Sequence, residues 1–385
     1  MSSYLIVFVA AAAVTFLTTP LVRRFVVRVG AVYQPNDRSV HRVPLPTMGG
    51  LAMYLGFVVA LALSRFLPFF SEINRASSSS TAALITCTLM LGLGVIDDTR
   101  GTTALSKFVA QVFIAGVLVL FGVQLSYFWF PGLGVFVLSG DLPVIVTIAW
   151  AVAVPNAVNL VDGLDGLAAG MVAIAAVFFF AYVVLNPGAF GPASQAALIS
   201  AITAGICLGF LPWNFYPAKI FMGDAGSMLL GMLLAIATIE GIGKNMTAPS
   251  GGDIAAIAGA IAVPFLVLLI PFLDVVLAIV RRTRRGQGIG HADKEHLHHR
   301  LMDIGHGHRQ AVLLMYLWSA LVSAGALAVG LIDGRFLVGL ILIGAASLFL
   351  ITALPRLARG RGNGSGPPPG GAAATDAPAD NLTAE

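Results

Sequence analysis

Four polar side chains recur at every third position of the stretch NAVNLVDGLDG, residues 156–166, inside otherwise apolar sequence. They are Asn156, Asn159, Asp162 and Asp165. Burying amides and carboxylates without partners is costly, so the pattern needs a cause. If the segment is helical, the side chains project along neighbouring positions, and their oxygens suit Mg²⁺, which proteins hold through one or two oxygens plus substrate phosphates. The pattern favours a metal–phosphate site, with a cap and turn between two helices as the alternative.

A pair of adjacent carboxylates, Asp97 and Asp98, ends the apolar run LGLGVIDD. Adjacent carboxylates repel each other unless a cation or basic group offsets them. Lys107 and Gln111, spaced i and i+4 on the next apolar segment, are positioned to face that pair. The pair is predicted to act as a general base or to organise a Mg²⁺-bound phosphate; a solvated acidic helix end is the alternative.

A third acidic position, Asp224, stands in the segment WNFYPAKIFMGDAGS immediately before an apolar run. A carboxylate there is either an N-cap or a metal ligand beside a helix N-terminus, where anions bind readily. In the second case Asn214 and Lys219 would approach a phosphate or nucleotide.

Two loops carry basic and imidazole groups that suit anion recognition. The segment 281–310 contains His296, His298 and His299 next to Arg300, and the segment 31–50 contains Arg38 and His41. The alternatives are a zinc site on the histidines, although no regular ligand spacing is evident, and ordinary basic loops at a membrane surface.

The composition sets the fold that must position these groups. Of 385 residues, 58% are hydrophobic and 10% charged, with a mean hydropathy of +0.91, whereas soluble domains carry about 25% charged residues. We predict an all-α polytopic membrane protein with about eleven transmembrane helices in one domain over 1–354, a short outer hairpin within 122–140, and a disordered tail over 355–385. The expected spans are 4–22, 49–69, 81–97, 108–124, 143–161, 166–185, 194–211, 224–243, 255–280, 311–331 and 336–354.

The distribution of basic residues predicts the orientation. With the N-terminus outside, 18 of the 22 Lys and Arg fall on the cytoplasmic loops 23–48, 98–107, 162–165, 212–223 and 281–310 and on the tail. The seven histidines and the acidic motifs then lie on the cytoplasmic side as well. Because the net charge of +4 is accounted for by loops beside the membrane, we expect no nucleic-acid partner. An ion-coupled transporter, which would place carboxylates near the bilayer midplane, is the alternative from another class.

Several motifs in this order, LGVIDD, NAVNLVDGLDGLAAG, WNFYPAKIFMGDAGS, PFLDVVLAIVRR and HLHHRL, closely resemble the polyprenyl-phosphate N-acetylhexosamine-1-phosphate transferase family. The resemblance covers about residues 30 to 310. It implies transfer of a sugar 1-phosphate from a UDP-sugar to a membrane polyprenyl phosphate, releasing UMP and requiring Mg²⁺, with Mn²⁺ as a substitute. HLHHRL fits the N-acetylglucosamine 1-phosphate branch, with UDP-GlcNAc as donor, better than the phospho-N-acetylmuramoyl-pentapeptide transferase branch, which stays the alternative.

The resemblance also implies roles for residues. Asp97 and Asp98 match the pair proposed to deprotonate or position the lipid phosphate, and Asp162 and Asp165 join them as the catalytic carboxylates. Asn159 and Asp224 match the residues that hold Mg²⁺. The expected substrate-binding residues are Lys107, Asn156, Asn214, His296, His298, His299, Arg300, Arg38 and His41.

Two positions depart from the family's pattern. Tyr33 stands where relatives often have Asp, and Ser39 stands where they often have a basic residue. The expected location is a bacterial plasma membrane, with the active site at its cytoplasmic face. A homodimer is an arrangement that the sequence leaves open.

Overall fold

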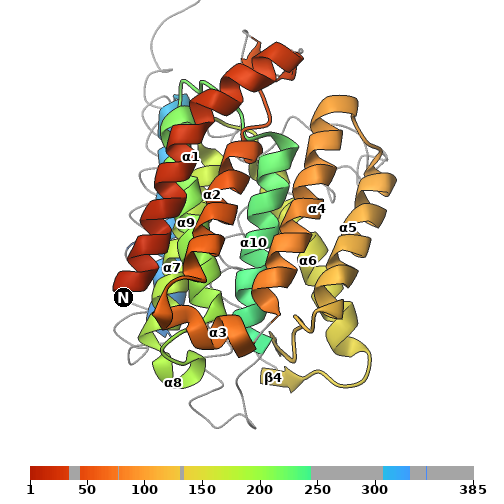
Figure 1. The fold of residues 1–385 in the computed structure, drawn as a ribbon, viewed down its shortest axis with the longest axis vertical. Helices are drawn as coiled ribbons and strands as arrows, with labels where there is room; N and C mark the ends of the chain where they lie inside the picture. The colour runs from red at the N-terminus through yellow and green to blue at the C-terminus, as the bar shows by residue number, and fades with distance from the viewer. Residues whose placement is uncertain (34–43, 77, 131–133, 244–306, 330–343, 345–385) are drawn as a thin grey trace, which may run out of the picture.

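The computed structural model describes residues 1–33, 44–76, 78–130, 134–243, 307–329 and 344, and these form a bundle of helices (Figure 1). The helices are α1 (Ser2–Val29), α2 (Gly50–Ser64), η1 (Pro68–Phe70), α3 (Ser71–Ala76), α4 (Ser79–Arg100), α5 (Ala104–Leu120), α6 (Leu142–Val161), α7 (Leu167–Leu185), α8 (Pro187–Phe190), α9 (Gln195–Asn214), α10 (Gly223–Gly243) and α13 (His308–Val329). The strands are β1 (Val32–Tyr33), β2 (Leu45–Pro46), β3 (Tyr127–Phe130) and β4 (Gly134–Val137).

Six of the described helices are long and apolar enough to cross a membrane: α1, α4, α6, α7, α9 and α10. A spanning helix needs about 20 apolar residues, and α5, with 17 residues, is apolar but shorter. The chain is therefore a mostly helical, multi-pass membrane protein, as its composition predicts. The total of eleven spans and the orientation stay predictions, because the expected spans 255–280 and 336–354, apart from residue 344, and the tail 355–385 lie outside the described residues.

The predicted span 49–69 is not one straight helix. α2 ends at Ser64, and the chain turns by 86° before η1 and α3. Pro68 opens η1 and has no backbone N–H to continue the hydrogen-bond ladder of a preceding helix. α2 and the η1–α3 segment count as a seventh span only if the bent pair crosses as a unit.

The predicted hairpin within 122–140 is confirmed as a structural element. β3 and β4 pair antiparallel, with Tyr127 opposite Val137 and Phe130 opposite Gly134. The hairpin lies at the end of the bundle where α1 begins (Figure 1). A second pair, β1 and β2, joins the segments on either side of 34–43.

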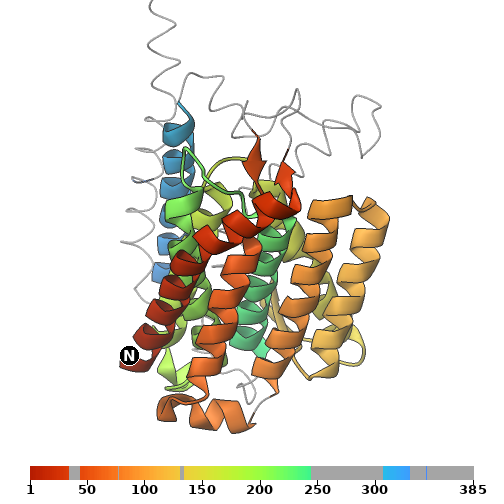
Figure 2. The same ribbon diagram turned by 45° about the horizontal axis from the view of Figure 1, so that its top comes forward.

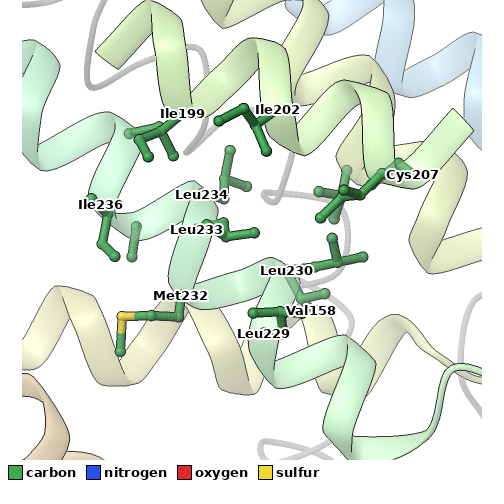
Figure 3. Close-up of a cluster of buried hydrophobic side chains, with 14 of the residues drawn as sticks. Val158, Ile199, Ile202, Cys207, Leu229, Leu230, Met232, Leu233, Leu234 and Ile236 are labelled. Carbon is green, nitrogen blue, oxygen red and sulfur yellow. The ribbon is translucent and has the colours of Figure 1, made fainter. Parts of the chain in front are cut away.

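α10 is the central helix of the bundle, between α4, α6 and α9 (Figure 1). In α10, 83% of the most apolar stretch is buried, against 28% in α1. Leu229, Leu233 and Ile236 of α10 pack with Ile202 of α9 and Val158 of α6 (Figure 3). A helix that is apolar all round is expected in such a position.

Small residues allow α10 to approach its neighbours closely. A methyl group on Gly94 of α4 would lie 2.4 Å from the Cα of Ala225, and one on Gly50 of α2 would lie 2.3 Å from the backbone nitrogen of Gly226. In a bilayer, helix association depends on such packing because lipid tails are as apolar as leucine. The first turn of α10 is thereby fixed against two other helices.

The polar motifs converge at one end of the bundle. α4, α6 and α9 end there, and α5, α7 and α10 begin there, opposite the α1 N-terminus and the hairpin (Figures 1 and 2). The connection between α4 and α5 is shorter than the predicted loop 98–107, since α4 continues to Arg100 and α5 starts at Ala104. Asp97, Asp98 and Lys107 are therefore all helical.

Candidate active site

Lys107 joins two carboxylates that are far apart in sequence. Its Nζ lies 2.6 Å from Asp97 Oδ2 and 2.5 Å from Asp224 Oδ2. Asp224 is the most open of the three, with 31% of its side chain exposed, against 13% for Asp97 and 14% for Lys107. α5 therefore supplies the cation that offsets the acidic residues of α4 and α10, as the spacing of the second motif predicts.

The short turn between α4 and α5 sets this geometry. Gly101 adopts a φ of 68°, a conformation that glycine accepts readily, and Thr103 caps α5 by accepting from the Ser106 backbone N–H. Thr102 donates to Asp97 Oδ1 through both its backbone N–H, at 2.7 Å, and its hydroxyl, at 2.5 Å. One oxygen of Asp97 is thus held by its own turn, while the other faces Lys107.

Asp98 caps α10 from another helix. Its Oδ1 accepts from the backbone N–H of Asp224 at 2.9 Å, and its Oδ2 accepts from that of Ala225 at 3.1 Å. These are among the N–H groups that a helix N-terminus leaves without intrahelical partners. Asp224, in the first turn of α10, is therefore positioned by a cap from α4 and is not itself the capping residue.

α6 contributes the two asparagines of the opening motif to different contacts. Asn159 Nδ2 donates to Asp224 Oδ1 at 2.7 Å and to Ser227 Oγ at 2.9 Å. Asn156 Nδ2 donates to Gln111 Oε1 at 2.6 Å, one helical turn away from that cluster. Asn159 thus contacts the carboxylate with which it is predicted to share a metal, and Asn156 links α6 to α5.

Asp162 lies half-buried at the end of α6, beside the same carboxylates. Burial, together with the negative charges of Asp224, Asp98 and Asp165, raises the pKa of Asp162 to about 8. Without a bound cation, the neutral acid is therefore the prevailing form of Asp162 at pH 7.

Asp165 and Asn214 are buried and connect two loops, in contrast to the half-exposed Asp224. Asp165 Oδ2 accepts from the backbone N–H of Ala218 at 2.9 Å. Asn214 accepts from the Gly166 N–H and donates to the Ile220 carbonyl, both at 3.1 Å. The side chains predicted to catalyse and to bind substrate thus fix the 215–222 loop, which leads into Asp224, against the turn after α6.

An apolar cavity of about 810 Å³ opens between α5 and α6 next to the carboxylates. Phe108, Ile145, Ile148 and Val152 are among its apolar lining residues. Its polar lining residues are Lys107, Gln111, Asn156 and Asn159. Among the described residues that line this cavity, the charged one is therefore Lys107, which bridges Asp97 and Asp224.

Other predicted residues stand apart from this cluster or outside the described part. Arg38, His41 and Ser39, within 34–43, and His296, His298, His299 and Arg300, within 244–306, lie outside the described residues. Tyr33 packs edge-on against Phe221, with ring centroids 5.8 Å apart. Lys219 Nζ lies over the Trp213 ring, 5.1 Å from its centroid.

Sequence reasoning did not identify Thr102 and Ser227 as parts of the cluster. Ser227 follows Asp224 by three residues, so helical spacing alone would have placed it on the same face. Thr102 contacts Asp97 through a turn whose geometry depends on Gly101.

The cluster fits a divalent cation held jointly with phosphate oxygens. Within the described ranges, no three His, Cys, Asp or Glu side chains form a metal site. Mg²⁺, however, needs only one or two protein oxygens when phosphates supply others. The ammonium of Lys107 already lies between Asp97 and Asp224, which shows that this position favours a positive charge.

Comparison with known proteins shows to which family the chain that carries this site belongs. The family model Glycosyl transferase family 4 matches residues 80–242, which cover α4 to α10 except for the first residue of α4 and the last of α10. The chain is 42% identical over 356 residues to the decaprenyl-phosphate N-acetylglucosaminephosphotransferase of Mycobacterium tuberculosis (strain H37Rv), covering 91% of this chain and 88% of that one.

More distant relatives include both branches considered above. A probable undecaprenyl-phosphate N-acetylglucosaminyl 1-phosphate transferase of Bacillus subtilis is 35% identical over 322 residues, 84% of each chain. A phospho-N-acetylmuramoyl-pentapeptide-transferase of Frankia alni is 34% identical over 280 residues, 62% of this chain and 76% of that one. With the helical carboxylate cluster at one end of the bundle, these matches show that the chain belongs to glycosyl transferase family 4, in the polyprenyl-phosphate N-acetylhexosamine-1-phosphate transferase family.

Proposed function

We propose that the protein transfers N-acetylglucosamine 1-phosphate from UDP-GlcNAc to a polyprenyl phosphate, forming polyprenyl-diphosphate-GlcNAc and UMP. The observation that carries the proposal is the Asp97–Lys107–Asp224 cluster, which adjoins an apolar cavity in a membrane-spanning bundle. The 42% identity to a phosphotransferase named for this acceptor class and this sugar supports the choice of substrates.

The cavity between α5 and α6 suits the lipid acceptor. Its walls are mainly apolar, as a prenyl chain requires, and Lys107 lies where the chain would end in a phosphate. A lysine ammonium is a compact cation that binds phosphate as a point charge. We therefore assign the cavity to the prenyl chain and the Lys107 end to its phosphate.

Asp224 and Asn159 are the proposed protein ligands of Mg²⁺, with Mn²⁺ as a substitute. When bound there, the cation supplies charge neutralisation for the diphosphate of the donor. Asp98 holds the first turn of α10 in place, and Asn159 orients Asp224 by donating from its Nδ2 to Asp224 Oδ1. Phosphoryl transfer depends on this positioning more than on covalent chemistry by the protein.

In the proposed reaction, an oxygen of the polyprenyl phosphate bonds to the sugar-bearing phosphorus of UDP-GlcNAc. The bond from that phosphorus to the oxygen bridging the two phosphates breaks, and UMP leaves with that oxygen. Phosphate monoesters have a second pKa near 6, so the acceptor is already ionised at pH 7. Asp97 and Asp98, which accept hydrogen bonds from protein groups, then serve mainly to position Lys107 and Asp224.

The remaining predicted residues complete the proposal. Asp162 faces the cluster, and the segments that contain Arg38, His41 and the three histidines with Arg300 are assigned to the UDP-sugar. Asp165 and Asn214 act by holding the 215–222 loop, and Asn156 by supporting α5. We place the site at the cytoplasmic face of a bacterial plasma membrane because 18 of the 22 Lys and Arg then lie inside. A homodimer stays a prediction.

The test is a donor screen with the purified protein in nanodiscs. Undecaprenyl phosphate, Mg²⁺ and either UDP-GlcNAc or UDP-MurNAc-pentapeptide are supplied, and UMP release is measured. We expect UMP release when UDP-GlcNAc is the donor and none when UDP-MurNAc-pentapeptide is the donor. EDTA should abolish the release. Release only with UDP-MurNAc-pentapeptide would move the protein to the other branch, and release with neither donor would contradict the proposed reaction.

A further inference from the structure

Lys107 stands at the junction between the carboxylate cluster and the acceptor cavity. Its ammonium contacts Asp97 Oδ2 and Asp224 Oδ2 while its side chain lines the cavity. A lysine in this position has two sets of negative partners: the carboxylates that it already contacts, and any phosphate that enters the cavity. It cannot neutralise both sets fully.

The two carboxylates are built to remain in place if Lys107 leaves. In each, Oδ1 is held by the protein: Asp97 Oδ1 by Thr102, and Asp224 Oδ1 by Asn159. In each, Oδ2 is the oxygen that faces Lys107. The Lys107 contacts are thus the ones that can change partner without moving α4 or α10.

The charge of the cluster opposes an incoming phosphate. Asp97, Asp98 and Asp224 lie close enough to affect one another electrostatically, and among the described residues Lys107 is the basic group that contacts two of them directly. A phosphate dianion that drew Lys107 away would leave these carboxylates facing new negative charge. A second cation on Asp224 removes that obstacle.

We propose that Lys107 is an exchangeable cation that couples metal binding to acceptor binding. In the metal-free protein it bridges Asp97 Oδ2 and Asp224 Oδ2; when a divalent cation binds at Asp224, Lys107 leaves that carboxylate and donates to the acceptor phosphate at the mouth of the cavity. The long, flexible lysine stem permits this movement while the Asp97 contact is kept. The inference rests on the proposed function for the identity of the acceptor, but the competition between Lys107 and the metal does not.

The competition is tested with Mn²⁺ alone, by titrating the purified protein and following free Mn²⁺ by electron paramagnetic resonance. A competing group lowers apparent affinity, so Lys107→Met should bind Mn²⁺ at least about tenfold more tightly than the wild type. Arg100→Met is the matched control: it removes one positive charge from the exposed end of α4, three residues after Asp97, and should change the affinity by less than about twofold. Equal or weaker Mn²⁺ binding in Lys107→Met would overturn the proposal.

The coupling is tested by repeating the titration with undecaprenyl phosphate in the nanodiscs. Linkage requires the lipid to raise the Mn²⁺ affinity by the same factor by which Mn²⁺ raises the lipid affinity, and we expect about tenfold in the wild type and less than about twofold in Lys107→Met. Undecaprenol, which has the same chain without the phosphate, should have no effect. Full coupling in Lys107→Met would assign the effect to other groups and refute the exchange.

Two further measurements, thermal unfolding and UMP release, distinguish a folding defect and a failure of the proposed reaction from a failure of the exchange. Thermal unfolding checks that Lys107→Met is folded; if it is not, absence of reciprocal coupling in the wild type is the outcome that overturns the proposal. If the wild type releases no UMP with any donor but Lys107→Met still tightens Mn²⁺ binding, the proposed reaction fails and the exchange stands.

Discussion

The cap that Asp98 provides for α10 leads to a prediction that separates positioning from chemistry. Asp98→Asn keeps the size of the side chain but replaces one acceptor oxygen with an NH₂ group. Of the two bonds to Asp224 N–H and Ala225 N–H, at 2.9 and 3.1 Å, only one can then be made, and that one loses its charge. The other backbone N–H would face another donor.

The expected size of the effect follows from these two bonds. A hydrogen bond to a charged group contributes about 1.5–3 kcal/mol and a neutral one about 1 kcal/mol, so losing one and weakening the other costs roughly 3 kcal/mol. Relief of repulsion between Asp98 and the neighbouring carboxylates offsets part of this, leaving a net loss of about 2 kcal/mol. We expect the displaced first turn of α10 to raise the activation barrier by a similar amount, which would lower kcat at least about tenfold, since about 1.4 kcal/mol of barrier corresponds to a tenfold change in rate.

The assay combines thermal unfolding in detergent with UMP release. Asp141→Asn is the matched control, because Asp141 is an exposed carboxylate at the start of α6 that makes no side-chain cap bond. We expect a lower Tm and a lower kcat for Asp98→Asn and neither for Asp141→Asn. An unchanged Tm with a lost kcat would refute the capping argument and assign Asp98 to the reacting atoms.

Three further predictions test the same end of the bundle. Gly94→Val should lower the Tm and the yield of folded protein, because a Cβ at this position would lie 2.4 Å from the α10 backbone. Gly92→Val, on the same helix but with open space around it, is the control and should fold normally. Equal stability of the two variants would contradict the close packing of α4 against α10. Folding raises the pKa of Asp162 from 3.8 to about 8, so between these pH values the unfolded chain binds fewer protons than the folded one, and the free energy of unfolding falls as the pH rises towards 8. Asp162→Asn should remove this fall when Tm is measured in EDTA from pH 6 to 9. A fall that persists in the variant would assign it to other groups. Asp165→Asn should retain most UMP release, because the amide oxygen can still accept from Ala218 N–H, whereas Asp165→Ala should lose it; equal loss in both would indicate that the charge itself takes part in the reaction.

Local sequence pattern was sufficient for part of this structure. Apolar runs of about 20 residues predict the spanning helices, and the alternation around Pro131 and Gly132 predicts the hairpin of β3 and β4. The i, i+4 spacing of Lys107 and Gln111 places both on the face of α5 that meets the acidic cluster and α6. In each case the information lies within one contiguous stretch of about 20 residues or fewer.

The contacts that build the site could not be predicted in this way. Asp98 meets the Asp224 N–H across 126 positions of sequence, and Lys107 meets Asp224 across 117. The Asp98 contact depends on how closely α4 and α10 approach at Gly94, and the Lys107 contact depends on how α5 is placed beside them; both are set by three-dimensional packing. The different environments of Asp165, Asn214 and Asp224 could not be predicted from local sequence either. All three are polar residues in apolar sequence, but Asp165 and Asn214 are buried between two loops whereas Asp224 is half-exposed.

The central position of α10 has a consequence for how the enzyme can change over evolutionary time. The helix that carries Asp224 is enclosed by α2, α4, α6, α7 and α9, so almost any substitution along it requires matching changes in a neighbour. A new donor or acceptor preference is therefore more accessible through the peripheral loops and the α5–α6 cavity than through this helix. Inhibitors that contact the first turn of α10 should accordingly select resistance slowly, whereas those that rely on the cavity walls should meet it sooner.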